Sequence, residues 1–244
     1  MRRNYRKPPI VEAVCEFRFR STREWDWTIP GLIYDRIKSE FPEKRQQKSF
    51  EVSIAPVEGK ITEVGGGLSR MQFLRSDGSA MVQLGPDLLA INVYPPYPQW
   101  ENFEALINNH LALYAGIAEP AGVKRIGLRY INKITFQEPT IEMTDYFELY
   151  PRLPRAVPQE HGTFTMRIMQ AYEGGRDTLN LRMRDVKSNT GTASILLDLD
   201  YFLAQPEFDL KEGMAWIPVA HQNLEGMFEA CITDKTREMF EEIR

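Results

Sequence analysis

The chain of 244 residues has few cysteines, no long apolar run and no excess of basic residues. Its two cysteines, Cys15 and Cys231, lie in segments with an apolar pattern and outside any Cys/His cluster, so we expect buried free thiols in a reducing cytoplasm. No apolar run approaches the roughly 20 residues that span a bilayer, and no apolar stretch follows the basic start of the chain as a secretory signal would require. These absences predict a soluble, cytoplasmic protein without membrane contact.

Signatures of catalysis and of cofactor binding are also missing. His110, His161 and His221 are far apart in the sequence, and we expect them in elements of different types. The run Gly65–Gly67 lacks the Lys-Ser/Thr of a phosphate loop and is expected to form a turn. Residues 58–60 (Glu-Gly-Lys) have a spacing that many metal-dependent nucleases use, but the upstream aspartate on a neighbouring strand is missing. We therefore expect no metal and no cofactor, and a non-enzymatic role is favoured over an enzymatic one.

The composition is that of a folded protein with an acidic balance. Hydrophobic residues make up 43% of the chain and charged residues 26%, which is typical of a packed globular domain. The net charge is −4, whereas nucleic-acid binders usually present a strongly basic surface. The basic start, Arg2–Lys7, could contact an acidic surface or nucleic acid, or be mobile.

The order of predicted elements repeats once along the chain. In the strand Val11–Arg20 apolar and polar residues alternate, and a helix follows over residues 28–41, ended by Pro42. Trp100, Phe103, Ile107, Leu111 and Tyr114 give a second helix one apolar face. The strands predicted between these two helices are Phe50–Ala55, Arg70–Leu74, Ala80–Leu84 and Leu88–Tyr94.

The second half restarts with a long strand and closes with a long helix. The strand alternation covers Val123–Phe136, a short helix is expected over Met143–Tyr150, and the closing helix is expected over His221–Ile243. The strands predicted between these helices are Phe164–Tyr172, Thr178–Asp185 and Ala193–Leu199.

These patterns predict an α+β protein. After a basic tail over residues 1–9, residues 10–120 form a strand–helix–four-strand–helix unit, and residues 121–244 form a strand–helix–three-strand–helix unit. We expect the two units to build one compact domain, in which a curved antiparallel sheet carries helices on one side. This element order resembles the duplicated fold of TATA-binding protein and, in outline, the helix-grip fold of START-like ligand-binding domains. A resemblance in element order alone carries no argument about function.

Several segments together resemble one family of bacterial proteins. The segments are Pro8–Val14, Tyr94–Tyr97 with Trp100 and Phe103, Arg125–Lys133, Leu197–Asp200, and His221 with Phe228, Ile232–Asp234, Arg237, Glu238 and Phe240. The family comprises proteins of about 250 residues that occur sporadically and have no assigned function. The resemblance implies a bacterial cytoplasmic protein, and the patchy occurrence would fit defence or mobile-element systems. It implies no catalytic residues.

The polar side of the predicted strands is locally positive. Nine basic residues against five acidic ones leave an excess of positive charge there, although the whole chain has a net charge of −4. The basic residues are Arg18, Arg20, Arg70, Arg125, Arg129, Lys133, Arg167, Arg182 and Arg184, and the acidic ones are Glu12, Glu16, Glu51, Asp198 and Asp200. An uncovered face of this kind suits an anionic partner, and cross-strand ion pairs on a solvated face are the alternative interpretation.

The sequence thus favours a non-enzymatic binding or regulatory protein. We expect a protein partner or a second copy of the chain, with nucleic acid as an alternative. The predicted contact residues are Arg125, Arg129, Lys133, Arg167, Arg182 and Arg184. The competing hypothesis is a small-molecule binder or enzyme with a cavity between the sheet and a long helix, which would require that Trp100, Phe103 and Phe228 leave that space incompletely filled.

Overall fold

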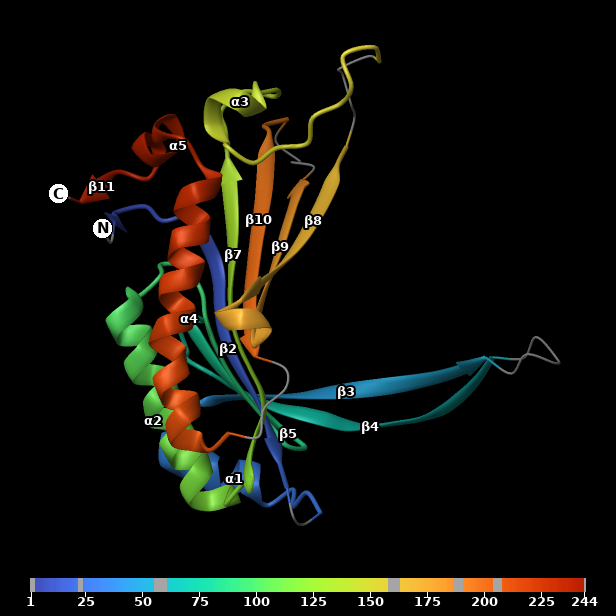
Figure 1. The fold of residues 1–244 in the computed structure, drawn as a ribbon. Coiled ribbons are helices and arrows are strands. Elements are labelled where there is room, and N and C mark those ends of the chain that lie inside the picture. Colours follow the sequence, from blue (N-terminus) through green and yellow to red (C-terminus); the bar gives the residue numbers. More distant parts are fainter. Residues whose placement is uncertain are drawn as a thin grey trace.

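A computed structural model gives the fold. It describes residues 3–21, 24–54, 61–157, 163–186, 191–203 and 208–243, so the Glu-Gly-Lys motif at 58–60 and His161 lie outside the described residues. Nine strands form one antiparallel sheet in the order β3-β4-β5-β6-β2-β7-β10-β9-β8. The sheet does not close into a barrel, and the helices lie on one side of it (Figure 1). The predicted α+β class and one-sided helix layer are confirmed.

The two halves of the chain build the two halves of this sheet. The first half contains β2 (Ile10–Arg20), α1 (Ile29–Ile37), β3 (Glu43–Ile54), β4 (Ile61–Leu74), β5 (Ala80–Gly85), β6 (Leu88–Val93) and α2 (Trp100–Ala118). The second half contains β7 (Gly122–Thr135), α3 (Met143–Tyr146), β8 (Thr165–Tyr172), η1 (Glu173–Gly175), β9 (Asp177–Asp185), β10 (Ser194–Leu203), α4 (Leu210–Cys231) and α5 (Asp234–Met239). A separate two-stranded sheet joins β1 (Asn4–Tyr5) to β11 (Glu242–Ile243).

A central pair of strands, β2 and β7, joins the halves. From β2 the order outward is β6, β5, β4 and β3, and from β7 it is β10, β9 and β8. Each half therefore places its last strand beside its first, and the first half has one more strand at its outer edge. The β3–β4 hairpin extends well beyond the rest of the sheet (Figure 1).

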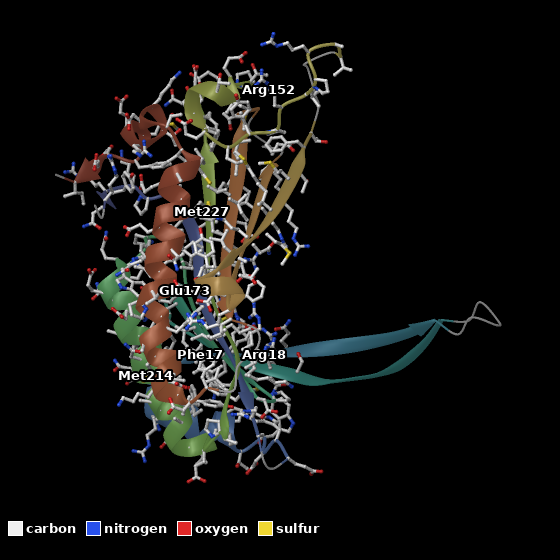
Figure 2. All side chains as sticks on the ribbon, in the orientation of Figure 1. Phe17, Arg18, Arg152, Glu173, Met214 and Met227 are labelled. Carbon is white, nitrogen blue, oxygen red and sulfur yellow. The ribbon has the colours of Figure 1, made fainter. Side chains whose placement is uncertain are left out.

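The core lies between the sheet and the helices. Alternate residues of β2 point into it, and Ala13, Cys15, Phe17 and Phe19 are almost completely buried. The long helix α4 packs on β7 and β10, while α2 packs on β6 and on α1. Figure 2 shows the labelled Phe17 on the helix side of β2 and Arg18 on the opposite side. The period-two pattern of the sequence therefore identified the buried side of this strand.

The closing helix differs from its predicted bounds. It begins at Leu210, because Asp209 and Glu212 form a capping box: the Asp209 carboxylate accepts a bond from the Glu212 amide at 2.8 Å, and the Asp209 amide donates to the Glu212 carboxylate at 3.0 Å. It ends at Cys231, because Ile232 is extended and bridges Phe147. The prediction of one helix over His221–Ile243 is therefore wrong.

Other predicted elements also differ from those observed. Gly65–Gly67 lies within β4 instead of forming a turn, next to an irregularity in the β3–β4 register. The strand predicted from Phe50 begins at Glu43 and is described as far as Ile54. The short helix ends at Tyr146, since Phe147 joins the bridge to Ile232.

The described part of the basic N-terminal segment is docked on the C-terminal segment. β1 pairs with β11, and Arg3 lies 3.0 Å from the Glu242 carboxylate. The buried Tyr5 donates a hydrogen bond of 2.7 Å from its hydroxyl to Glu229. Both ends of the chain therefore meet beside α4. Within the described ranges, we find no helix long and apolar enough to cross a membrane.

Candidate functional site

The face of the sheet away from the helices carries all six predicted contact residues. They lie on β7, β8 and β9, and the strand register arranges them in rows because directly paired residues point to the same side. One row runs Lys133, Leu196, Arg184 and Thr165; the next runs Ile131, Asp198, Arg182 and Arg167; a third contains Arg129, Asp200 and Asn180. We call this surface the open face of the second half.

The inner arginines of the open face have carboxylate partners. Arg129 makes a two-pronged contact with Asp198, with Nε–Oδ1 at 2.6 Å and Nη2–Oδ2 at 2.7 Å. The hydrogen bonds to Asp198 raise the pKa of Arg129, so this guanidinium stays charged. The alternative interpretation, a solvated face with cross-strand ion pairs, therefore holds for Arg129.

Arg125 is held in the same way, from two strands. Its guanidinium lies 3.3 Å from Glu16 and 3.7 Å from Asp200, and it stacks over the ring of Phe202 at 4.9 Å. Burial raises the pKa of Asp200, and the nearby Arg125 and Arg129 oppose that rise. Charge on this inner part of the face is therefore largely balanced.

The outer part of the open face is different. We call Lys133, Arg167, Arg182 and Arg184 the outer basic cluster; all four are exposed, and none lies within ion-pair distance of a carboxylate belonging to a described side chain. Arg167 directly faces Arg182 across β8 and β9. Its Nε donates a 2.7 Å bond to the Asn180 side-chain oxygen. Like charges directly opposite each other destabilise a strand pair, so this cluster would gain from an added anion.

The open face of the first half carries a ladder of amide side chains. Gln72 donates to Gln83 at 3.0 Å, Gln83 donates to Asn92 at 2.9 Å, and Asn92 donates to Glu12 at 2.6 Å. Gln83 and Asn92 are buried, and their side-chain groups bond to each other. This ladder was not predicted from the sequence, although polar amides at alternate strand positions were a usable signal. A satisfied ladder offers few free groups to a partner.

A pocket lies on the other side of the sheet, near the chain termini. The imidazole of His221 stacks on the Trp100 ring at 3.9 Å, and its Nδ1 lies 3.1 Å from the hydroxyl of Tyr130. That hydroxyl lies 3.1 Å from the hydroxyl of Tyr97, which completes a chain of three polar groups. Burial raises the pKa of Tyr130, so its hydroxyl stays protonated. Phe228 also lines the pocket, which is partly open to solvent.

The side chains named by the cavity hypothesis fill most of the space under the helices. Phe103 is fully buried and Trp100 is nearly so. The pocket therefore occurs only beside them, where Phe228 is half-buried. His110 packs on Phe41 instead of lying at this pocket, so the two described histidines stay apart. The described side chains include no group of histidine, cysteine and carboxylate residues that could hold a metal ion.

Comparison with known proteins gives no functional assignment. No protein-family model matches the chain. No curated protein matches its sequence.

Proposed function

We propose that the protein is a non-catalytic binding protein that recognises an acidic segment of a partner protein on the outer basic cluster. The observation that carries the proposal is the direct opposition of Arg167 and Arg182, beside Arg184 and Lys133, on a face that no helix covers. The repulsion between the two guanidinium groups is removed when an anion lies between them. A protein partner is favoured over nucleic acid by the acidic net charge of −4.

We further propose that the protein is cytoplasmic and belongs to the sporadically distributed bacterial family that segments such as Pro8–Val14 resemble. A binding role suits a protein in defence or mobile-element systems, since such systems work through recognition.

The test compares charge-reversed variants with labelled probes. Wild-type protein is expected to bind a labelled oligoglutamate peptide, and the double variant Arg167→Glu/Arg184→Glu is expected to bind it at least tenfold more weakly. The control is Arg36→Glu, on the exposed surface of α1. Arg129 and Arg182 are left intact, because a glutamate at either position would lie beside Asp198 and destabilise the fold.

Two outcomes would contradict the proposal. Equal affinity of wild type and the double variant for oligoglutamate would exclude the outer basic cluster as the site. Tighter binding of DNA than of oligoglutamate, with affinity falling steeply as salt rises, would instead assign the cluster to nucleic acid.

The aromatic pocket supports a second candidate function, small-molecule binding. The carrying observation is the chain Tyr97–Tyr130–His221, whose polar groups line a space with aromatic walls. Thermal unfolding in the presence of a metabolite library tests it. A compound that stabilises wild-type protein but not Phe228→Glu is the expected result, and no stabilisation across the library would weigh against this candidate.

A further inference from the structure

The outer edge of β8 is open. One side of β8 pairs with β9 in an unbroken register from Thr165 to Tyr172, without a bulge. The strand contains no proline, and no described residue outside β9 makes a backbone hydrogen bond with it. An unprotected edge strand presents a row of free amides and carbonyls that can pair with another chain.

Comparison of the two halves shows what could lie beyond this edge. In the first half β3 lies outside β4, and α1 covers the helix side there, with Tyr34 packing on Phe73 at 5.1 Å between ring centres. In the second half α3 is a four-residue helix that packs on α5, and the described residues between α3 and β8 form no strand. Pro151 and Pro154 lie in that stretch, and proline disfavours strand pairing. The described chain therefore leaves the equivalent of the β3 position unfilled.

An apolar groove runs along the helix side of this edge. It lies between α4, β8 and the residues after α3, and it is partly open to solvent. Its apolar lining includes Leu149, Ile168, Leu179, Leu181, Met227 and Ala230. Ile168 is 39% exposed, which is unusual for an isoleucine beside a core. Met227, labelled in Figure 2, projects from α4. The outer basic cluster lies on the opposite face of the sheet, and its member Arg167 is on β8 itself.

We propose that an extended segment of a partner protein, with acidic and apolar residues in alternation, adds to β8 as a further strand. This inference rests on the proposed function and names the partner's chemistry. Side chains alternate between the two faces of a strand, so such a segment places carboxylates beside Arg167, one strand away from Arg182, and apolar side chains in the groove beside Ile168. Its backbone supplies the hydrogen bonds that the β8 edge lacks.

The charges argue against a second copy of the chain as the occupant. Edge-to-edge pairing of two β8 strands would bring two outer basic clusters together on one sheet, and each already opposes Arg167 to Arg182. Such pairing adds repulsion, whereas an acidic strand removes it. An acidic partner segment is therefore the occupant that the surface fits.

The probe is a synthetic peptide of Glu-Val repeats as long as β8. We expect it to bind at least tenfold more tightly than oligoglutamate of equal charge, because valines enter the groove. A version N-methylated at every residue keeps the side chains but has no amide donors, and we expect it to lose at least tenfold in affinity. Hydrogen exchange is expected to slow at the β8 amides when the unmodified peptide binds.

Paired variants test the groove. Ile168→Asp is expected to weaken the Glu-Val peptide at least tenfold while leaving oligoglutamate binding unchanged. Leu32→Asp is the matched control, because Leu32 is an exposed aliphatic residue on α1, 55% exposed. Neither of the two replaced side chains is buried, so both variants should fold.

The outcomes separate this inference from the proposed function. If oligoglutamate binds as tightly as the Glu-Val peptide and N-methylation has no effect, strand addition is overturned while recognition of acidic segments stands. If neither peptide binds wild-type protein, both proposals are overturned. Slowed exchange at β8 together with loss of binding on N-methylation would establish the added strand.

Discussion

Asp177 is a fully buried carboxylate at the start of β9. It accepts hydrogen bonds of 3.0 Å from both the Tyr201 hydroxyl and the Trp216 indole, and Arg176 contacts both of its oxygens at 2.8 Å. These donors come from β10, α4 and the residue before β9, so one side chain joins three parts of the second half. Burial and the neighbouring Asp177 raise the pKa of Tyr201, which therefore stays a donor.

Replacing Asp177 with asparagine tests this role. The asparagine NH₂ group would face donors in place of an acceptor, and Arg176 would lose its counter-charge. We expect the free energy of unfolding to fall by about 3 kcal/mol, measured by urea denaturation. Asp234→Asn is the control, because the Asp234 side chain is 87% exposed. Equal stability of the two variants would show that the buried carboxylate contributes nothing specific.

His110 predicts a pH dependence of stability. Its Nδ1 lies 2.8 Å from the Leu106 carbonyl, to which it donates, and the buried Nε2 has no hydrogen-bond partner among the described residues. Burial lowers the pKa of His110; the Leu106 bond and Glu40 oppose that change, whereas Arg75 adds to it. In the unfolded chain the imidazole takes up a proton near pH 6.5, whereas the folded protein resists it until a lower pH.

The free energy of unfolding should therefore fall as the pH is lowered from 7 toward 5, and His110 should account for up to about 1.4 kcal/mol per pH unit. The variant His110→Leu should lose that part of the slope, and urea denaturation at several pH values measures it. Parallel slopes for wild type and variant would contradict the assignment.

The expectation of buried free thiols is confirmed at the same scale: Cys15 and Cys231 are both buried, and burial raises the pKa of Cys231 to about 12.

Elements with a clear period were predictable from the sequence. The alternation in β2 and β7 and the apolar stripe of α2 gave strands and a helix close to those observed. The start of β3 was not predictable in this way, because residues 43–49 are all polar and carry no apolar alternation. The start of α4 did have a signal in the sequence, the Asp209–Glu212 capping box, which the predicted helix bounds left out.

The capping box should contribute measurably to the stability of α4. Asp209→Ala removes the acceptor for the Glu212 amide, and we expect the free energy of unfolding to fall by about 1 kcal/mol in urea denaturation. Asp209→Ser keeps a capping oxygen and should recover most of the loss. An alanine variant as stable as wild type would show that the helix start is held by packing alone.

The open face marks the limit of sequence-based prediction at the element scale. Strand parity placed Arg125, Arg129 and Arg182 on one side, and the register does pair residues of these strands on one face. It could not show that Arg129 is neutralised by Asp198 while Arg182 faces Arg167, because both depend on which strands become neighbours. Strand order is set by packing across the whole sheet, which local periodicity does not encode.

At the scale of the whole molecule, the two halves share one sheet and one core. β2 pairs with β7 across the boundary, and Trp100 of the first half stacks on His221 of the second. The two halves therefore lack independent cores, and partial unfolding of either would expose apolar surface of the other.

We therefore expect a single cooperative unfolding transition. Far-ultraviolet circular dichroism reports the whole chain, and each of two single-tryptophan variants reports one half: one keeps Trp25, the other keeps Trp216. Within each variant, the urea midpoints from circular dichroism and from fluorescence should coincide. An earlier fluorescence midpoint for one half would mean that the units unfold separately. Trp216 donates a hydrogen bond to Asp177, so the variant without Trp216 is expected to unfold at a lower urea concentration than wild type. Its fluorescence midpoint is therefore compared only with the circular-dichroism midpoint of the same variant. Coincident midpoints in both variants would show that the two halves, joined by the central β2–β7 pair, unfold as one cooperative unit.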